Sequence, residues 1–431
     1  MKLRLKIFHW ILFLWFLIAL FNYEIIIDYL SLFISYIGML VSDIDAAVAV
    51  LNFNLVDAFI STLLFLVAIP VVIIKKKKLI YLNGRLTFSF AVLITLCFIF
   101  LFAPIISNEN PEFSKDLSVT KLLPPFSSVK QIKIIRWLTE DEESSYSEIE
   151  NFRKKLDDVI KPSFDENLIF ADSTNLSRKF VYYQYGKAKE LNKEDSLTDV
   201  GIPLIKNKTF ILGTDEYGRD LFARLIYGTR ISLTVGFGAV VLSFFIGIIL
   251  GFIAGYRGGL PDILLNRFTE IFLAFPVIYL VVLILALFGS SIISVIIVLG
   301  ISGWMSLFKI VRSEVVSIKQ KDFFSTAELV GLSKTQLLTN EILPVIIVPV
   351  LVNLVFLFSN VVLAEAALSY LGLGTGNNYP SWGSMISSGQ QYITKAWWLI
   401  AFPGLGLILT LFSINSLSRI VGKKLNPYLK N

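Results

Sequence analysis

The side chains that most often carry out chemistry in proteins are scarce in this chain. It has one histidine, His9, and one cysteine, Cys97. A single cysteine excludes an intrachain disulfide and a thiolate metal cluster, and a single histidine excludes histidine-based metal sites and a Ser-His-Asp triad. Both residues lie in apolar runs, where a packed or interfacial side chain is the usual finding. We therefore expect no metal site and no catalytic residue.

One polar cluster with defined spacing precedes a long apolar run. It comprises Gly213, Thr214, Asp215, Gly218, Arg219 and Asp220, followed by Arg224. The glycines permit tight turns, and the side chains of Asp215, Arg219 and Asp220 can pair with one another. We favour a structural cap before the apolar run over direct contact with a substrate.

A second cluster lies in a loop rich in lysine and serine. Its members are Asp322, Phe323, Phe324, Ser325, Thr326, Ala327, Gly331, Ile342, Leu343 and Pro344. Asp322 is expected to cap a short helix that ends at Gly331, with Phe323 and Phe324 exposed on its surface. Such a helix could dock in a groove of another protein or lie on a membrane surface, and the residues alone favour neither alternative.

The segments that hold these clusters are strongly apolar. Of the 431 residues, 55% are hydrophobic and 17% are charged, whereas soluble domains carry roughly a quarter charged residues. Eight runs are long enough to cross roughly 30 Å of hydrocarbon as helices. They are residues 7–23, 56–74, 86–106, 231–256, 268–288, 292–310, 345–368 and 397–417. The chain is therefore expected to be an all-α polytopic membrane protein.

The charges between the runs predict its orientation. Lys75 to Lys78 and most other bases of the short loops fall on one side, which places both termini in the cytoplasm under the positive-inside rule. The apolar stretch 25–41 is interrupted by Asp28 and flanked by acids, so we expect it on the outer surface. The polar residues 107–229 are expected to face outward, with a helix near 149–160 and no chemistry in the acidic run from Glu140 to Glu143.

These segments divide the chain into four expected parts. They are an N-terminal extension over 1–85 with two membrane helices, a first core helix over 86–106, an extracytoplasmic insert over 107–229, and a core over 230–431 with five membrane helices and a cytoplasmic loop over 312–344.

Small residues and prolines inside the runs predict how the helices pack. Gly247, Gly251 and Gly255 recur every four residues and so share one helix face, which is a packing signal in bilayers. We expect this face to contact another subunit or another helix of the same chain. Pro276 and Pro403 are expected to bend their helices.

Two acids lie at the ends of apolar runs. Glu365 near an outer end is costly in lipid and should face protein or water. A role for Glu365 or Glu270 in a transport pathway stays open, although a satisfied structural hydrogen bond is the more frequent finding.

The two clusters together resemble one family. Residues 325–344 are similar to the EAA loop of binding-protein-dependent ABC importer permeases. They read Ser325-Thr326-Ala327, three residues, Gly331, ten residues and Ile342-Leu343-Pro344. Ser325 and Thr326 depart from the Glu and the first Ala of the motif. Residues 212–233 resemble the LGTDxxGRD…R…GxRxSL signature of the dipeptide, oligopeptide and nickel group. Residues 254–262, 365–374 and 380–383 resemble its AGYxGGxxD, EAxLSFLGLG and PSWG motifs, and residues 86–125 resemble the first span of its C-type partner.

The resemblance implies a six-helix permease core in a bacterial cytoplasmic membrane. It implies a second permease subunit, two ATPase subunits that dock at residues 322–332, and an extracytoplasmic substrate-binding protein. The chain holds no Gly-x-x-x-x-Gly-Lys-[Ser/Thr] loop for ATP phosphates, so the partners would use the ATP and this chain would bind no cofactor. The implied solutes are peptides, with nickel or other small solutes as alternatives. The implied transport mechanism is alternating access. Membrane lipid is an expected partner, and nucleic acid is not.

Two other classes of protein stay as alternatives. An ion-coupled secondary transporter would need paired intramembrane ionisable residues and repeated halves, which are not visible in the sequence. A membrane enzyme or sensor would need a nucleophile and a base in the insert, which holds neither histidine nor cysteine.

Overall fold

The structure is a computed structural model of the 431-residue chain, and it describes residues 6–75, 86–133, 148–176, 180–190, 204–376 and 379–425. The chain forms two compact units. Unit 1 comprises Met1–Leu86, Ile94–Arg230 and Ser388–Pro403, and unit 2 comprises Thr87–Leu93, Ile231–Ser387 and Gly404–Asn431. Within the described residues, seven helices are long and apolar enough to cross a membrane, or eight if one bent pair counts as a single span.

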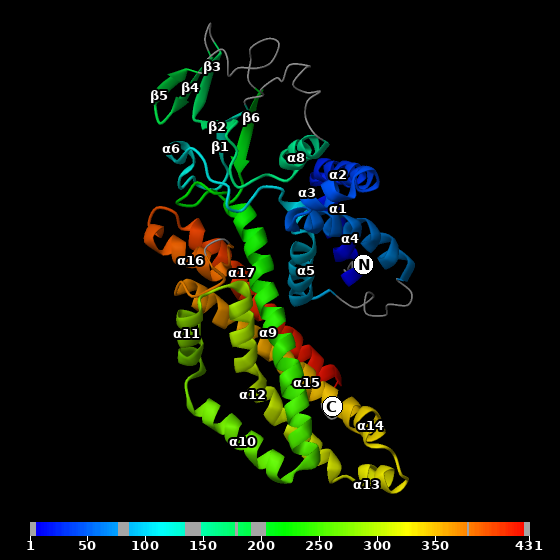
Figure 1. Ribbon diagram of the computed structural model, residues 1–431. Helices are drawn as coiled ribbons and strands as arrows, with labels where there is room; N and C mark the ends of the chain where they lie inside the picture. The colour runs from blue at the N-terminus through cyan, green and yellow to red at the C-terminus, as the bar shows by residue number, and fades with distance from the viewer. Residues whose placement is uncertain are drawn as a thin grey trace, which may run out of the picture. The chain divides into compact units, whose positions relative to one another are not determined.

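The N-terminal extension is a group of four helices in unit 1 (Figure 1). They are α1 (Ile7–Phe21), α2 (Tyr23–Ser42), α3 (Ile44–Val50) and α4 (Phe53–Lys75). The expected span over 7–23 is the 15-residue α1, which is shorter than a crossing requires, whereas the stretch 25–41 belongs to the 20-residue α2, which is long and apolar enough. Residues 25–41 are helical through Asp28, and α2 has the length and hydropathy of a span, so their placement on the outer surface stays a prediction. Lys76 to Lys78 lie outside the described residues.

The first core helix, α5 (Phe88–Ile106), is bent near its end. Phe102 has φ −117° and ψ 22°, outside the helical region, and Pro104 follows two residues later. Proline lacks the N–H that an inner helical turn needs, which accounts for the bend.

The insert adds two small antiparallel sheets that the apolar pattern did not predict. One has the order β2-β1-β6 and the other β3-β4-β5. The strands are β1 (Ser127–Lys133), β2 (Leu168–Ala171), β3 (Ser173–Leu176), β4 (Phe180–Gln184), β5 (Lys187–Glu190) and β6 (Leu204–Phe210), accompanied by the short helix α6 (Leu117–Thr120). The central strand β1 pairs Ile132 with both Ile169 and Ile205, and the buried side of this sheet packs around Phe170 and Phe210.

The helix expected near 149–160 is confirmed as α8 (Glu148–Val159). Its buried residues Phe152 and Leu156 pack in the same apolar cluster as helices of the extension. The acidic run from Glu140 to Glu143 lies outside the described residues.

Helix α9 (Leu221–Arg257) is longer than the expected span and passes from unit 1 into unit 2. The remaining long helices are α10 (Gly259–Ala274), α11 (Val277–Phe288), α12 (Ile292–Lys319), α15 (Leu343–Tyr370) and α17 (Trp398–Leu425), with the short α16 (Trp382–Gly389) before α17. The predicted bend at Pro276 is confirmed, since α10 and α11 meet at 84°. Pro403 lies within α17, which continues as one helix past it.

The glycine face of α9 packs against α12 of the same chain. A Cβ placed on Gly247, Gly251 or Gly255 would lie within 2.9 Å of the Cβ of Leu307, Val311 or Val315, respectively. Each pair is four residues from the next along both helices, so the two backbones approach closely over the whole length from Gly247 to Gly255. The intrachain alternative for this glycine face is therefore the one observed.

Candidate functional site

The predicted docking helix is α13 (Asp322–Leu329), between α12 and α15 (Figure 1). Its N-cap position is Lys321, and Asp322 is the first helical residue, so the expected capping role of Asp322 was wrong. No side chain caps this end. The Thr326 hydroxyl instead donates to the Asp322 carbonyl at 2.8 Å within the helix.

The two adjacent phenylalanines of α13 face different ways. Phe324 is only 2% exposed and packs with Val315 and Ile318 of α12, whereas Phe323 is exposed. Neighbouring residues on a helix point about 100° apart, so contact with α12 buries Phe324 and leaves Phe323 exposed. The expectation that Phe324 would be exposed was wrong.

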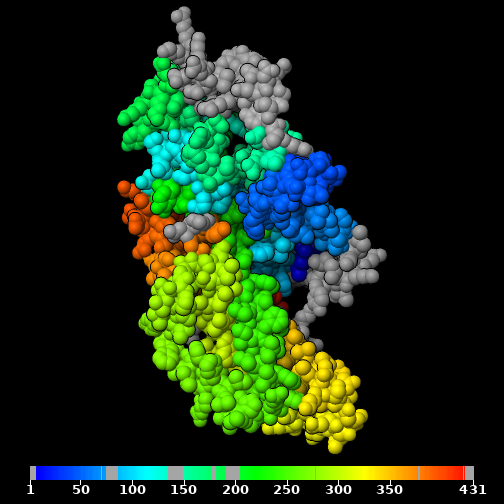
Figure 2. Space-filling model, viewed as in Figure 1, coloured from blue at the N-terminus to red at the C-terminus, as the bar shows by residue number. Residues whose placement is uncertain are grey.

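The exposed apolar tip of this region is formed by two residues that the sequence did not single out. Leu329 is 88% exposed and Val330 is 76% exposed, at the C-terminal end of α13. In Figure 2 the yellow atoms of this region lie on the surface of unit 2. We define the docking tip as Leu329 and Val330.

Gly331 ends α13 as predicted. Its φ is +88°, a left-handed value that glycine adopts without strain. The Gly331 N–H donates to the Glu328 carbonyl at 3.0 Å and the Leu332 N–H donates to the Ala327 carbonyl at 3.3 Å. These two bonds are the Schellman arrangement, which fixes how the chain leaves the helix. The docking tip is thus held at a defined turn.

The Ile342-Leu343-Pro344 segment anchors the other side of the loop. After α14 (Lys334–Gln336) a π-helical turn over Leu337–Ile342 leads directly into α15, with Pro344 at its second residue. Leu337 and Ile342 are buried in the same cluster as Phe324. The exposed Ser325 stands at the position where the family motif has Glu.

An ion pair that the sequence did not indicate lies close by in unit 2. The Arg312 guanidinium of α12 donates twice to the Asp262 carboxylate of α10, through Nη2 at 2.7 Å and through Nε. The Lys319 ammonium donates to the Tyr256 carbonyl at 2.7 Å. These contacts join the turn between α9 and α10 to the end of α12 that carries α13.

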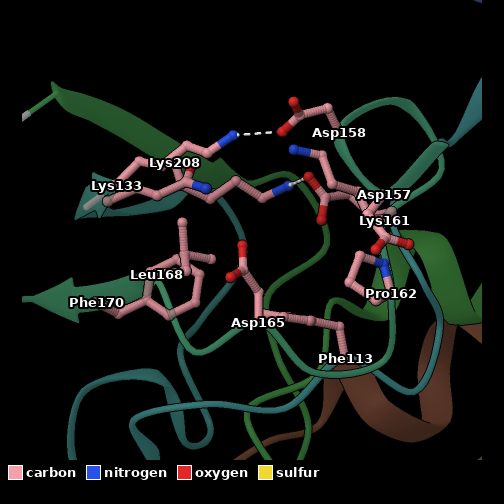
Figure 3. A pocket seen from close by; sticks show the side chains of 12 residues that line it. Phe113, Lys133, Asp157, Asp158, Lys161, Pro162, Asp165, Leu168, Phe170 and Lys208 are labelled. Carbon is pink, nitrogen blue, oxygen red and sulfur yellow. Dashed lines mark hydrogen bonds and ion pairs between the residues drawn. The ribbon is translucent and has the colours of Figure 1, made fainter. Parts of the chain in front are cut away.

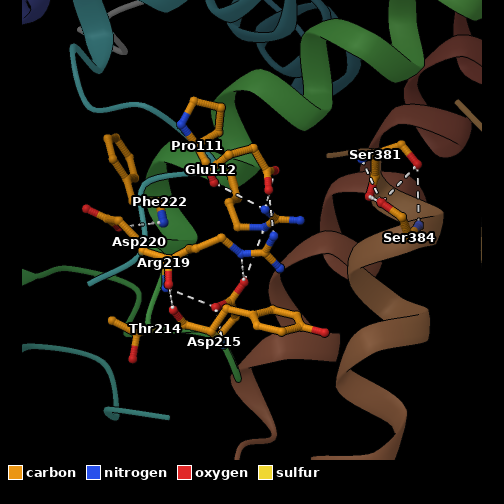
Figure 4. A network of polar contacts seen from close by, with 12 residues as sticks. Pro111, Glu112, Thr214, Asp215, Arg219, Asp220, Phe222, Ser381 and Ser384 are labelled. Carbon is orange, nitrogen blue, oxygen red and sulfur yellow. Dashed lines mark hydrogen bonds and ion pairs between the residues drawn. The ribbon is translucent and has the colours of Figure 1, made fainter. Parts of the chain in front are cut away.

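The second predicted cluster forms a hydrogen-bonded knot in unit 1 (Figure 4). The Asp215 carboxylate accepts from the backbone N–H groups of Tyr217 and Arg219, both at 2.9 Å, and from Arg219 Nε at 2.7 Å. Glu112 accepts from Arg219 Nη1 at 2.6 Å and also from Arg224. Glu112 is far away in sequence, and no spacing rule could have identified it.

Asp220 does not join Arg219 as expected. Its carboxylate accepts from the Phe222 N–H at 2.9 Å and so caps the start of α9. Lys208 lies 3.6 Å from Asp220 and 2.8 Å from Glu109. Burial raises the pKa of Asp220, with Lys208 acting in the opposite direction.

The two glycines of the knot are close to another segment of the insert. Gly213 has φ +82°, and a Cβ on it would lie 2.4 Å from the Leu123 carbonyl oxygen. Gly218 has φ +70°, and a Cβ on it would lie 2.1 Å from Oγ1 of Thr120. The Thr214 hydroxyl donates to the Thr120 carbonyl and accepts from the Leu123 N–H at 2.8 Å. These contacts support the structural interpretation of the cluster.

A pocket of the insert is lined by charged and aromatic side chains (Figure 3). Four of its charged side chains form two ion pairs, Lys133–Asp158 at 2.7 Å and Lys208–Glu109 at 2.8 Å. Among the described residues, no group of three His, Cys, Asp or Glu side chains is arranged to hold a metal ion.

Glu365 is fully buried within unit 2. Its carboxylate accepts from the Ser369 hydroxyl at 2.7 Å and from the Ser232 hydroxyl of α9 at 2.9 Å. Glu270 is exposed and pairs with Arg267 one turn away. Hydrogen bonding therefore accounts for the position of Glu365.

Residues 247–430 match the family described as the binding-protein-dependent transport system inner membrane component. The Di/tripeptide transport system permease protein DppC of Pseudomonas aeruginosa is 37% identical over 222 residues, covering 52% of this chain and 73% of that protein. The chain belongs to this permease family. The Oligopeptide transport system permease protein OppC of Haemophilus influenzae is 39% identical over 215 residues, covering 50% of the permease and 69% of that protein. A solved structure of the MetNI methionine ABC transporter in inward-facing conformations is a weak match, with 17% identity, a TM-score of 0.38, and coverage of 47% of the permease and 97% of that chain.

The comparisons confirm the expected family and the helical, multi-pass membrane class of the permease. The role of each residue in the two clusters stays a prediction.

Proposed function

We propose that the permease is one membrane subunit of an ATP-driven importer of short peptides. Relatives that are 37–39% identical to it are named as dipeptide or oligopeptide transport permeases. The importer would also contain a second permease subunit, two ATPase subunits and an extracytoplasmic substrate-binding protein. The permease itself carries no phosphate-binding loop in its sequence, so the ATPase subunits supply the energy.

The observation that carries this proposal is the docking tip, Leu329 and Val330. An exposed apolar pair on a surface is a common feature of protein interfaces. The tip stands on a rigid base, because Phe324 is buried against α12 and Gly331 fixes the turn that follows. A rigid apolar projection of this kind fits a groove in a partner. We assign that groove to an ATPase subunit.

The packing of unit 2 connects the docking tip to the membrane helices. The buried base of α13 contacts α12 through Val315 and Ile318, and contacts the π-helical turn that leads into α15 through Leu337 and Ile342. Movement of the tip would therefore displace both helices. Because α12 also packs on the glycine face of α9, three core helices would respond together, as alternating access requires.

The orientation follows from the same proposal. The loop that carries the tip lies in the cytoplasm with both termini, and the insert over 107–229 faces outward. In this orientation the insert is available to the substrate-binding protein. The alternative of an ion-coupled transporter gains no support from Glu365, whose carboxylate is occupied by two hydroxyl groups.

The proposal is tested by placing a charge on the tip. Val330→Asp should abolish co-purification of the ATPase subunits and peptide uptake, while the permease itself is produced at a normal level. The matched control is Leu371→Asp, which changes another exposed apolar residue, 62% exposed against 76% for Val330, at the C-cap of α15. Retention of the ATPase by Val330→Asp, or its loss in both variants, would contradict the proposal.

A further inference from the structure

The N-terminal extension lies outside the matched family region and is tied to the core helices by specific polar contacts. The Tyr29 hydroxyl of α2 donates to the Pro104 carbonyl of α5 at 3.0 Å in a buried position. The Ser61 hydroxyl of α4 donates to the Leu101 carbonyl of α5 at 2.9 Å. Both acceptors belong to the segment of α5 around its bend at Phe102.

A bend in a membrane helix is costly unless its backbone groups find partners. Lipid offers no hydrogen bonds, and a proline removes one donor from the helix. Pro104 also lies in the last turn of α5, where carbonyl groups have no partner within the helix. The hydroxyls of Tyr29 and Ser61 supply donors at this place.

Asp57 of the extension is the counter-ion of a core arginine. Its carboxylate accepts from both terminal nitrogens of Arg230 in α9, through Nη2 at 2.6 Å and through Nη1. The side chains are only 11% and 21% exposed. The Arg230 guanidinium also lies over the ring of Phe100 in α5, 5.9 Å from its centroid. One ion pair thus connects the extension with α9 beside α5.

Apolar packing surrounds these three polar contacts. The rings of Phe65 in α4 and Phe102 in α5 meet edge to face at 5.4 Å between centroids, and Trp15 of α1 stacks on Phe65. Tyr29, Phe65, Phe102 and Ile105 belong to one buried cluster. The extension therefore covers the bent part of α5 with matched apolar and polar groups.

We propose that residues 6–75 are a built-in clamp that stabilises the bend of α5 and neutralises Arg230 of α9. Tyr29 and Ser61 act as positioning residues for α5, and Asp57 acts as the positioning residue for α9. The permease then needs its extension to keep two core helices in place. The rival interpretation is an accessory group of helices that the core does not need.

The first test is a double-mutant cycle on the ion pair in the full-length permease. The variants are Asp57→Asn, Arg230→Gln and the double variant, and the measurement is the half-life of the monodisperse protein in detergent at a fixed temperature. Each single variant leaves one part-buried charge without this counter-charge, so each half-life should shorten about tenfold, and the double variant should recover most of that loss. Additive losses in the double variant, or unchanged half-lives in both single variants, would overturn the role of Asp57.

The second test removes the hydroxyl groups without changing the charges. Tyr29→Phe and Ser61→Ala should each shorten the half-life about threefold or more, because each removes a hydroxyl donor from a carbonyl near the bend of α5. The matched controls are Tyr23→Phe and Thr62→Val, since those hydroxyls bond to Glu24 and to the Ala58 carbonyl within their own helices. The controls should leave the half-life unchanged, and equal effects in test and control variants would overturn the clamp.

A third measurement reports on α5 directly. Cys97 is the one cysteine of the chain and is exposed on α5, so a nitroxide can be attached without other changes. Its electron paramagnetic resonance line should show higher mobility in Tyr29→Phe/Ser61→Ala than in Tyr23→Phe/Thr62→Val. Identical lines in the two double variants would show that the extension does not hold α5.

Discussion

The close approach of α9 and α12 makes Gly251→Ala a sharp test of the packing. The new methyl group would lie 2.8 Å from the Val311 Cβ and 2.9 Å from the Phe308 carbonyl oxygen. Both distances are far below a normal carbon contact of about 3.5–4.0 Å. A carbonyl oxygen of a helix cannot move aside without its helix, so α9 and α12 must separate.

The expected magnitude comes from two opposing effects. Overpacking a well-packed interior by one methyl group costs about 1–3 kcal/mol. Replacing a glycine inside a helix by alanine contributes up to about 1 kcal/mol in the other direction. Gly404→Ala provides only the second effect, because a Cβ there has open space around it within α17. Gly251→Ala should therefore be less stable than Gly404→Ala by about 1–3 kcal/mol.

The assay is the thermal unfolding of both purified variants in the same detergent, followed by peptide uptake in proteoliposomes. Gly251→Ala should unfold at a lower temperature than Gly404→Ala and should transport more slowly, since the proposed coupling from the docking tip runs through α12. If the two variants unfold at the same temperature, α9 and α12 do not approach as the structure shows.

Three further predictions concern the knot and the tip. Glu112→Gln should lower the unfolding free energy by about 1–3 kcal/mol, because Arg219 loses a charged acceptor; an unchanged urea midpoint would argue against the knot. Gly331→Ala should weaken ATPase co-purification, because its φ of +88° costs a non-glycine residue about 1 kcal/mol, and normal binding would contradict a fixed tip. Burial raises the pKa of Glu109, but the charge and hydrogen bond of Lys208 and the charge of Lys161 together outweigh it and hold this pKa below its ordinary value. The stability that Glu109 contributes is therefore present above about pH 4.3 and is lost as pH falls below it. Glu109→Gln should flatten this acidic limb in a pH series of unfolding midpoints, and an unaltered limb would exclude the pair as its cause.

Most membrane helices of the core were predictable because each is one long apolar run. The expected span over 268–288 is instead divided between α10 and α11, which meet at 84°. The bend at Pro276 and the close helix packing at the glycine face of α9 follow from the residue types themselves, so both could be inferred from the sequence. The N-terminal helices were assigned less well, because α1 is the more apolar helix but has only 15 residues, whereas α2 contains Glu24 and Asp28 and has 20 residues. The strands of the insert are short and half-exposed, which leaves no clear alternation to detect.

The candidate site was predictable only where its chemistry is local. Gly331 ends its helix through backbone geometry that the residue type dictates. The burial of Phe324 depends instead on which side of α13 meets α12, and that is set by the tertiary packing. The partners Glu112 and Asp57 lie 107 and 173 residues from the arginines that they bind, so no sequence pattern could connect them.

The claim at the centre of this account is that the tip of α13 receives an ATPase subunit. The most direct measurement places a photo-crosslinking amino acid at position 330 or at position 371 of the permease and identifies the captured protein by mass spectrometry. Position 330 should capture the nucleotide-hydrolysing subunit and position 371 should not. Capture of that subunit from position 371, or capture of the extracytoplasmic binding protein from position 330, would contradict the assigned orientation and function.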